Sequence, residues 1–207
     1  MAQKTDLKKT LDGYRATRHV FRLLDVPESR YLAVDGHGDP NTSPAFAGAV
    51  ETLYPVAYRL KAASRTELGH DYVVPPLEGL WWAGDMDAFT TARDKAQWDW
   101  TLMLLVPDWI EPARVDAVLA GAAAAADPPP RLADLRVQRL AEGRCVQTLH
   151  LGAFDDEAEV LARLHREYLP EHALRPTGRH HEIYLSDARR VEPAKRRTIL
   201  RQPVVDA

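Results

Sequence analysis

Glu182 and its neighbours, near the C-terminal end of the chain, are the residues whose types and spacing could do chemistry. Glu182 lies in the run of residues 180–185, HHEIYL, whose alternation is typical of a half-buried β-strand. On a strand the side chains at 180, 182 and 184 share one face, whereas Ile183 and Leu185 share the other and anchor the core. A carboxylate directed into an aromatic-walled cleft could be a counter-ion for a flat cation or a base for water. The alternative is a solvated glutamate on an open sheet face, because most glutamates are exposed.

All five tryptophans precede this strand, and four of them lie in two close pairs. On extended backbone Trp98 and Trp100 project to the same side, whereas Trp81 and Trp82 project to opposite sides. At least one ring of each pair could therefore line a ligand cleft. For each single ring the alternative is packing in the core, because tryptophan is usually buried.

His180 and Glu182, with His150 from another predicted strand, could in principle ligate a metal. The spacing is generic, however, because His180 and His181 point in opposite directions and the sequence has no HExxH motif or Cys cluster. We therefore predict neither a metal nor a cofactor. The single cysteine, Cys145, lies in an alternating apolar run and is expected to be a buried structural thiol.

The composition is that of an ordinary folded protein. Hydrophobic residues make up 45% of the 207 residues and charged residues 28%, so a sizeable core can form. The formal net charge of -3 provides no basic field to hold nucleic acid or an anionic membrane. The basic residues Lys195, Arg196, Arg197 and Arg201 are most simply a solvated surface. Without an apolar signal segment or a membrane-span-length stretch, we expect a cytoplasmic protein with no nucleic-acid or membrane partner.

The first half of the chain predicts strands, one helix and strands again. Apolar residues at 20–24 and 31–35 predict a first hairpin, and helical spacing from Pro44 to Leu60 predicts a helix packed on it. Tyr54 and Tyr58 are four residues apart on that helix and could line one wall of a cleft, or pack. Pro55 predicts a kink or break there, because an interior proline removes a backbone bond. Two further strands are expected over 72–82 and 97–106.

The second half repeats this order after a helix over 111–126 and a proline-rich linker. Strands over 135–140 and 144–151, a helix from Asp156 to Tyr168, and strands over 180–185 and 198–203 follow. Leu77-Glu78-Gly79 and His181-Glu182-Ile183 occupy matching places in the two halves. The sequence therefore predicts an α+β domain of two tandem helix-on-antiparallel-sheet modules, β-β-α-β-β repeated. The pseudo-repeats span about 18–107 and 132–205, and a cleft would lie on their pseudo-twofold.

Six ordered motifs carry a family resemblance. They are VDGHGDPN at 34–41, LYPVAYRLK at 53–61, DYVVPPLEGLWW at 71–82, KAQWDWTLM at 95–103, EGRCVQTLHLG at 142–152 and HHEIYLSDARR at 180–190. Together they resemble the GyrI-like small-molecule-binding proteins, in particular the stand-alone subfamily of cyclopropanoid cyclopropyl hydrolases. The chain departs from that pattern at Pro55 and at Ala188.

The resemblance implies a ligand cleft with an aromatic cage and a central glutamate. Relatives bind lipophilic, often cationic drugs, and some open the strained ring of duocarmycin-type alkylating agents. On this basis we expect hydrolysis of a cyclopropane conjugated to a dienone, with Glu182 as general base and Tyr58 or Tyr184 as donor to the developing phenolate. The walls and neighbours of the cage would be Tyr54, Trp81, Trp82, Trp98, Trp100, His150 and His180.

Two other functions are open at this point. In the first, the protein sequesters a small planar hydrophobic or cationic ligand without turnover, and Glu182 supplies the counter-charge. In the second, it is a protein-interaction module that resembles the gyrase-inhibiting relatives. A regulator is disfavoured because no helix-turn-helix segment precedes the ligand domain.

Overall fold

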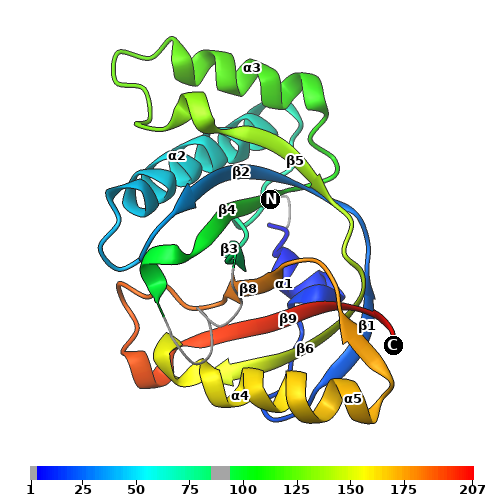
Figure 1. Cartoon of the computed structure of the whole chain (residues 1–207). Coiled ribbons are helices and arrows are strands. Elements are labelled where there is room, and N and C mark those ends of the chain that lie inside the picture. Colours follow the sequence, from blue (N-terminus) through cyan, green and yellow to red (C-terminus); the bar gives the residue numbers. More distant parts are fainter. Residues whose placement is uncertain (1–3, 85–93) are drawn as a thin grey trace.

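A single antiparallel sheet organises the computed structural model, which describes residues 4–84 and 94–207. Within these residues the strand order is β1-β6-β9-β8-β3-β4-β2-β5, and β7 pairs with β9 (Figure 1). The strands are β1 Arg22–Val26, β2 Ser29–His37, β3 Leu77–Trp82, β4 Asp99–Val106, β5 Arg136–Leu140, β6 Gly143–Leu151, β7 Leu174–Pro176, β8 His180–Tyr184 and β9 Arg197–Asp206. With the helices described below, this is the predicted α+β class.

Read outward from the central pair β3–β8, the two halves of the sheet carry equivalent strands in the same order. One side continues β4, β2, β5 and the other continues β9, β6, β1. The predicted hairpins are nevertheless wrong, because β1 pairs with β6 and β5 pairs with β2. A tight two-residue turn needs positive φ at its first position, whereas Pro27 in the link between β1 and β2 is confined to negative φ. The link between β1 and β2 therefore does not close a hairpin, and each edge strand pairs with the other half.

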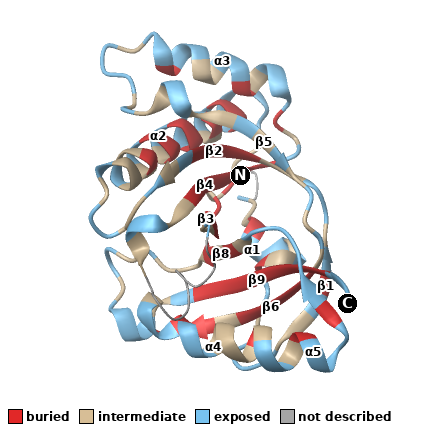
Figure 2. Ribbon diagram, viewed as in Figure 1, coloured by how far each residue is buried: buried red, intermediate tan, exposed pale blue. Residues whose placement is uncertain are grey.

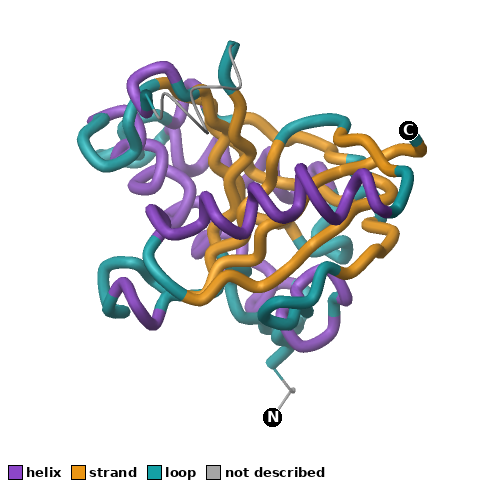
Figure 3. Tube along the Cα trace, turned by 60° about the horizontal axis from the view of Figure 1, so that its bottom comes forward, coloured by secondary structure: helices purple, strands orange, loops and turns teal. Residues whose placement is uncertain are grey.

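Longer helices cover the two ends of the sheet. α2 (Pro44–Glu67) lies along β2 and β4, and α3 (Pro112–Ala123) packs on α2 (Figure 1). On the other half α4 (Glu157–Arg163), a π-helical turn (Leu164–Tyr168) and α5 (Leu169–Glu171) form one continuous helix, seen in front in Figure 3. The N-terminal α1 (Leu7–Thr10) is short. No helix in the described part of the chain is both long and apolar enough to cross a membrane.

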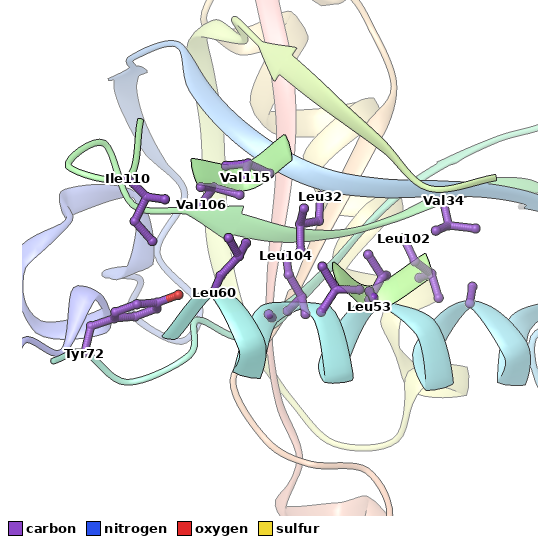
Figure 4. Close-up of a cluster of buried hydrophobic side chains, with 14 of the residues drawn as sticks. Leu32, Val34, Leu53, Leu60, Tyr72, Leu102, Leu104, Val106, Ile110 and Val115 are labelled. Atoms are coloured by element: carbon purple, nitrogen blue, oxygen red, sulfur yellow. The ribbon is translucent and has the colours of Figure 1, made fainter. Parts of the chain in front are cut away.

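The larger core lies between α2 and the β2–β4 part of the sheet. Leu53 and Leu60 of α2 pack on Leu32, Leu102 and Leu104, and all five side chains are at most 1% exposed (Figure 4). Buried residues follow the inner face of α2 and the central strands (Figure 2). At about 1.5–3 kcal/mol for each fully buried aliphatic side chain, this face fixes α2 against the sheet.

α2 continues through Pro55, so of the kink or break that the sequence predicts, the break does not occur. The proline has no N–H to give to the carbonyl of Glu51, at a cost of about 3 kcal/mol in a helix interior. Leu53 and Val56 on either side of it are fully buried, and their packing outweighs that cost. Pro55 itself is exposed, so its ring does not disturb the core.

A buried ionic cluster occupies the sheet face opposite α2 and α4. Arg201, predicted to be solvated, is only 2% exposed and donates to Glu142 at 2.8 Å. His181 lies between two carboxylates, 3.0 Å from Glu142 and 2.9 Å from Glu78. Tyr14 donates to Glu78 at 2.5 Å and so ties the N-terminal segment to the sheet. The cluster is a buried ion-pair network, in which oppositely charged partners neutralise one another in the interior.

Candidate active site

A cavity of about 860 Å³ lies between α2 and the N-terminal end of α4, over the central strands β3 and β8. Its walls are rich in aromatic rings, which come from both halves of the chain. They are Phe46, Tyr54 and Tyr58 of α2, Trp81 of β3, Trp98 beside β4, Phe154 before α4, and Tyr184 of β8. Such a cavity is large enough for a drug-sized ligand, and its aromatic rings suit the faces of a flat molecule, although charged residues also line it.

Glu182 lines this cavity from the face of β8 opposite Ile183, and the alternation of the strand predicts that it lies opposite Ile183. Its side chain is 14% exposed, so it is neither a solvated surface residue nor sealed in the core. The Tyr184 hydroxyl donates to Glu182 Oε2 at 2.8 Å, and Trp81 Nε1 donates to the Tyr184 hydroxyl at 3.0 Å. This chain of hydrogen bonds fixes the carboxylate and leaves Oε1 for other partners.

Tyr184 keeps its proton in this arrangement. Burial and the neighbouring carboxylates of Glu182 and Glu157 hold the pKa of Tyr184 well above its usual range. Because its one hydroxyl proton is committed to Glu182, the tyrosine orients the carboxylate and cannot at the same time donate to a ligand.

Gly79 is the residue that makes room for these contacts. It lies directly across the strand pair from Glu182. A Cβ at this position would lie 2.8 Å from Trp81 Nε1 and 3.2 Å from the Tyr184 hydroxyl. The Trp81–Tyr184 hydrogen bond can therefore lie over the sheet only where the side chain is absent. This role was not predicted from the sequence, although a glycine inside a strand often marks such a close approach.

His180 lies two residues before Glu182, on the same face of β8. Its Nε2 is 3.6 Å from Glu182 Oε1, and its side chain is 10% exposed. Neither of its ring nitrogens has a hydrogen-bond partner among the residues that the structure describes. His165, on the π-helical turn, is close enough that burial together with the His180 ring lowers the pKa of His165 to about 4.

Glu157 adds a second carboxylate to the cavity, and the sequence analysis did not find it. It is the first residue of α4, is 5% exposed and lines the cavity. Its charge contributes to the raised pKa of Tyr184, so two carboxylates flank that hydroxyl. The predicted helix start at Asp156 indicated only a capping role for this region.

Charged residues form the rim of the cavity. Lys95 and Asp155 make an ion pair at 2.9 Å between the segments before β4 and α4. Arg189 is held by Asp187 at 3.0 Å, and the Arg196 guanidinium lies 5.2 Å from the centre of the Phe154 ring. The aromatic side chains of the cavity thus lie between the carboxylates of Glu157 and Glu182 and the charged residues of the rim.

Of the ten site residues predicted from the sequence, six line the cavity, namely Tyr54, Tyr58, Trp81, Trp98, Glu182 and Tyr184. Their individual roles remain predictions. Tyr58 is 57% exposed and so lies at the rim. Phe46 and Phe154 line the same cavity but were not predicted, because an isolated phenylalanine cannot be told from a core residue by its spacing.

The other four predicted residues do not line the cavity. Trp100 is fully buried and donates to the Gly38 carbonyl at 3.2 Å, and Trp82 is stacked under Arg179 on the other side of the sheet. His150 is 5% exposed and contacts the Ala153 carbonyl. Packing and local contacts already occupy these three side chains. His180 contacts Glu182 and not the cavity.

The cavity therefore offers one oriented carboxylate, a second buried carboxylate and a set of rings. In the described part of the chain, no group of three or more His, Cys, Asp or Glu side chains could hold a metal ion. The residues present can bind a flat molecule by its faces, attract positive charge, and accept a proton from a water at Glu182.

Several solved structures are similar to this chain. It is 35% identical to a conserved protein from Listeria innocua, covering 98% of this chain and 100% of that one with a TM-score of 0.87. A hydrolase from Listeria innocua is 33% identical, with the same coverage and a TM-score of 0.81. The C-terminal domain of EcmrR, at 11% identity and a TM-score of 0.53, shares the fold alone. No protein with a curated description matches the sequence.

Residues 19–204 match the family described as the GyrI-like small molecule binding domain. This match includes every residue that lines the cavity except Lys8. The chain belongs to the GyrI-like small-molecule-binding domain family.

Proposed function

We propose that the protein binds flat lipophilic compounds and hydrolyses a cyclopropane conjugated to a dienone, and that it thereby protects the cell from such alkylating agents. The observation that carries this proposal is the Glu182 carboxylate, oriented by Tyr184 inside an aromatic cavity. The similarity to a Listeria innocua protein named a hydrolase supports a catalytic role.

The reaction needs a positioned water and a place for negative charge. The water oxygen forms a bond to the ring carbon, the strained carbon–carbon bond breaks, and its electron pair moves through the dienone to the carbonyl oxygen. Glu182 takes the proton of the water, a role that typically accelerates a reaction about 10²- to 10⁴-fold. The phenolate that forms then takes a proton from solvent or from a nearby hydroxyl. Aromatisation makes the step downhill.

The rings would position the substrate for this attack. Trp81 and Trp98 meet edge to face with their centres 5.7 Å apart, and Phe46 stacks on Trp81. Holding a planar substrate against fixed rings beside the general base converts the attack into an effectively intramolecular event. Tyr58 at the rim is the candidate donor to the phenolate oxygen, because the Tyr184 proton is committed to Glu182.

The test is turnover by Glu182→Gln. We expect this variant to lose activity on a spirocyclopropyl cyclohexadienone, followed by the loss of dienone absorbance, and to retain affinity for the neutral phenol product. Glu159→Gln is the matched control, because Glu159 is an exposed residue of α4 outside the cavity. Unchanged turnover in Glu182→Gln would remove the catalytic assignment.

The second candidate function is sequestration of lipophilic cations. The observation that favours it is the pair of carboxylates, Glu157 and Glu182, beside the rings. A cation over an aromatic face gains about 0.5 to 2 kcal/mol. If the protein is a binder, Glu182→Gln should weaken binding of a flat cation but not of its neutral isostere. A hydrolase without this role would show equal losses for both, or none.

A further inference from the structure

We propose that His180 takes the proton from Glu182 after each attack and so returns the carboxylate to its charged form. This inference rests on the proposed function of Glu182. His180 would then be a positioning residue that acts through Glu182, since it does not line the cavity.

The geometry assigns each carboxylate oxygen a different neighbour. Oε2 accepts from the Tyr184 hydroxyl at 2.8 Å, whereas Oε1 lies 3.6 Å from His180 Nε2. Both residues lie on one strand face, two positions apart, so their side chains are neighbours. Catalytic hydrogen bonds are often long in ligand-free structures and shorten in the complex.

The His180 ring is not explained by packing alone. Its side chain is 90% buried, and neither nitrogen finds a hydrogen-bond partner in the described part of the chain. A buried polar group without a partner costs free energy, so its presence calls for a role. With its proton on Nδ1, the neutral ring presents the Nε2 lone pair to the proton that Glu182 receives.

The neighbouring titratable groups leave His180 as the acceptor. Tyr184 keeps its proton, because burial and the two carboxylates raise its pKa. His165 stays neutral near pH 7 because burial and the His180 ring lower its pKa to about 4, so it adds no positive charge beside His180. Trp81, which faces His180 across the strand pair, carries no charge. Glu157, which lines the cavity and raises the pKa of Tyr184, adds negative charge to the site.

The protons balance without any other reactant. The water proton moves to Glu182 and then to His180 Nε2, while the phenolate takes one proton from solvent. When the product leaves, His180 returns its proton to solvent. A route through His180 lets the proton leave Glu182 while the product still occupies the cavity.

The experiment compares His180→Asn with His19→Asn on the spirocyclopropyl cyclohexadienone. Asparagine keeps polarity but cannot carry the proton; His19 is exposed and has a positive φ of 63°, a conformation that asparagine tolerates. We expect kcat of His180→Asn to fall about tenfold or more, below the full contribution of a general base, with KM unchanged. Free imidazole in the buffer should restore part of kcat in His180→Asn and have no effect on His19→Asn.

Other outcomes overturn the inference. Wild-type kcat in His180→Asn, with Glu182→Gln inactive, would reject the role of His180 and leave the hydrolysis intact. A loss of kcat that imidazole does not restore, accompanied by a weaker affinity for the phenol product or a lower melting temperature, would show that His180 only supports the structure. Full turnover by Glu182→Gln would reject the proposed function itself and with it the role of His180.

Discussion

Glu78 and Glu182 lie on the two central strands of the sheet but face opposite sides of it. Glu78 pairs with Ile183 and Gly79 pairs with Glu182, so one carboxylate points to the buried ionic cluster and the other to the cavity. Glu78 is fully buried beside His181, whereas Glu182 keeps an oxygen toward the cavity. The two glutamates that occupy matching places in the sequence are therefore not equivalent, and only Glu182 is available to a ligand.

Gly79→Ala should damage the site more than the fold. The new Cβ would lie 2.8 Å from Trp81 Nε1, so the Trp81–Tyr184 hydrogen bond must shift, and overpacking of this kind typically costs about 1–3 kcal/mol. We expect weaker binding of a flat aromatic probe, measured by tryptophan fluorescence, and a lower melting temperature. Gly121→Ala is the control: no atom lies within 4 Å of a Cβ there, and alanine favours a helix interior. Unaltered binding in Gly79→Ala would mean that the Trp81–Tyr184 contact does not shape the site.

The sequence predicted the orientation of Glu182 because that property is local. Alternation along residues 180–185 decides which side chains share a face, and the structure has Glu182 and Tyr184 on the cavity side of β8. The three predicted helices, over 44–60, 111–126 and 156–168, and the repeated strand order were predictable for the same reason. Periodicity and turn residues depend on neighbours in the sequence.

What the sequence could not predict depends on contacts between distant segments. The exchange of β1 and β5 between the halves is set by long-range pairing. Trp98 and Trp100 were predicted to project to the same side of their strand. Trp100 is nevertheless fully buried, because Gly36 has no side chain and the Trp100 ring lies against β2 there. Arg201 looks like one member of a basic surface cluster, and only its distant partners explain its burial: Glu142 in the link before β6, Gln147 of β6 and the Gly13 carbonyl.

Stability should fall as the pH rises because of His181. Burial alone would lower the pKa of His181, but the carboxylates of Glu142 and Glu78 outweigh it and raise the pKa to about 9. A histidine in the unfolded chain titrates near about 6.5. The stabilisation is therefore complete below about pH 6.5 and is lost as the pH rises through about 9. Urea unfolding at several pH values should show this decline, and His181→Asn should lack it. The same slope in both proteins would assign it to other groups.

Arg201→Met should destabilise the protein strongly. Arg201 and His181 compensate the buried Glu142 carboxylate, whose pKa burial would raise but these two cations lower to about 2. Removing one partner of a buried ion pair typically costs about 3–5 kcal/mol, because the other charge stays uncompensated. Arg197→Met is the control on the same strand, since Arg197 is exposed and such changes stay within about 0.5 kcal/mol. Chemical denaturation measures both. A small loss in Arg201→Met would show that solvent reaches Glu142.

Pro55→Ala should make the protein more stable, because it restores a backbone hydrogen bond to the Glu51 carbonyl in the middle of α2. An interior proline costs about 3 kcal/mol, and the greater freedom that alanine gives the unfolded chain offsets about 0.4–1 kcal/mol of the gain. Since Pro55 is exposed, little packing is lost, and thermal and urea unfolding should show a net gain of about 2 kcal/mol.

Pro44→Ala provides the comparison within the same helix. Pro44 is the first residue of α2, where a proline needs no hydrogen-bond partner, so its replacement should bring no such gain. Glu51 and Pro55 both line the cavity, so the helical turn that lacks this hydrogen bond forms part of its wall. If Pro55→Ala proved no more stable than the wild type, the proline would not strain α2, and the Glu51 carbonyl would already have another donor.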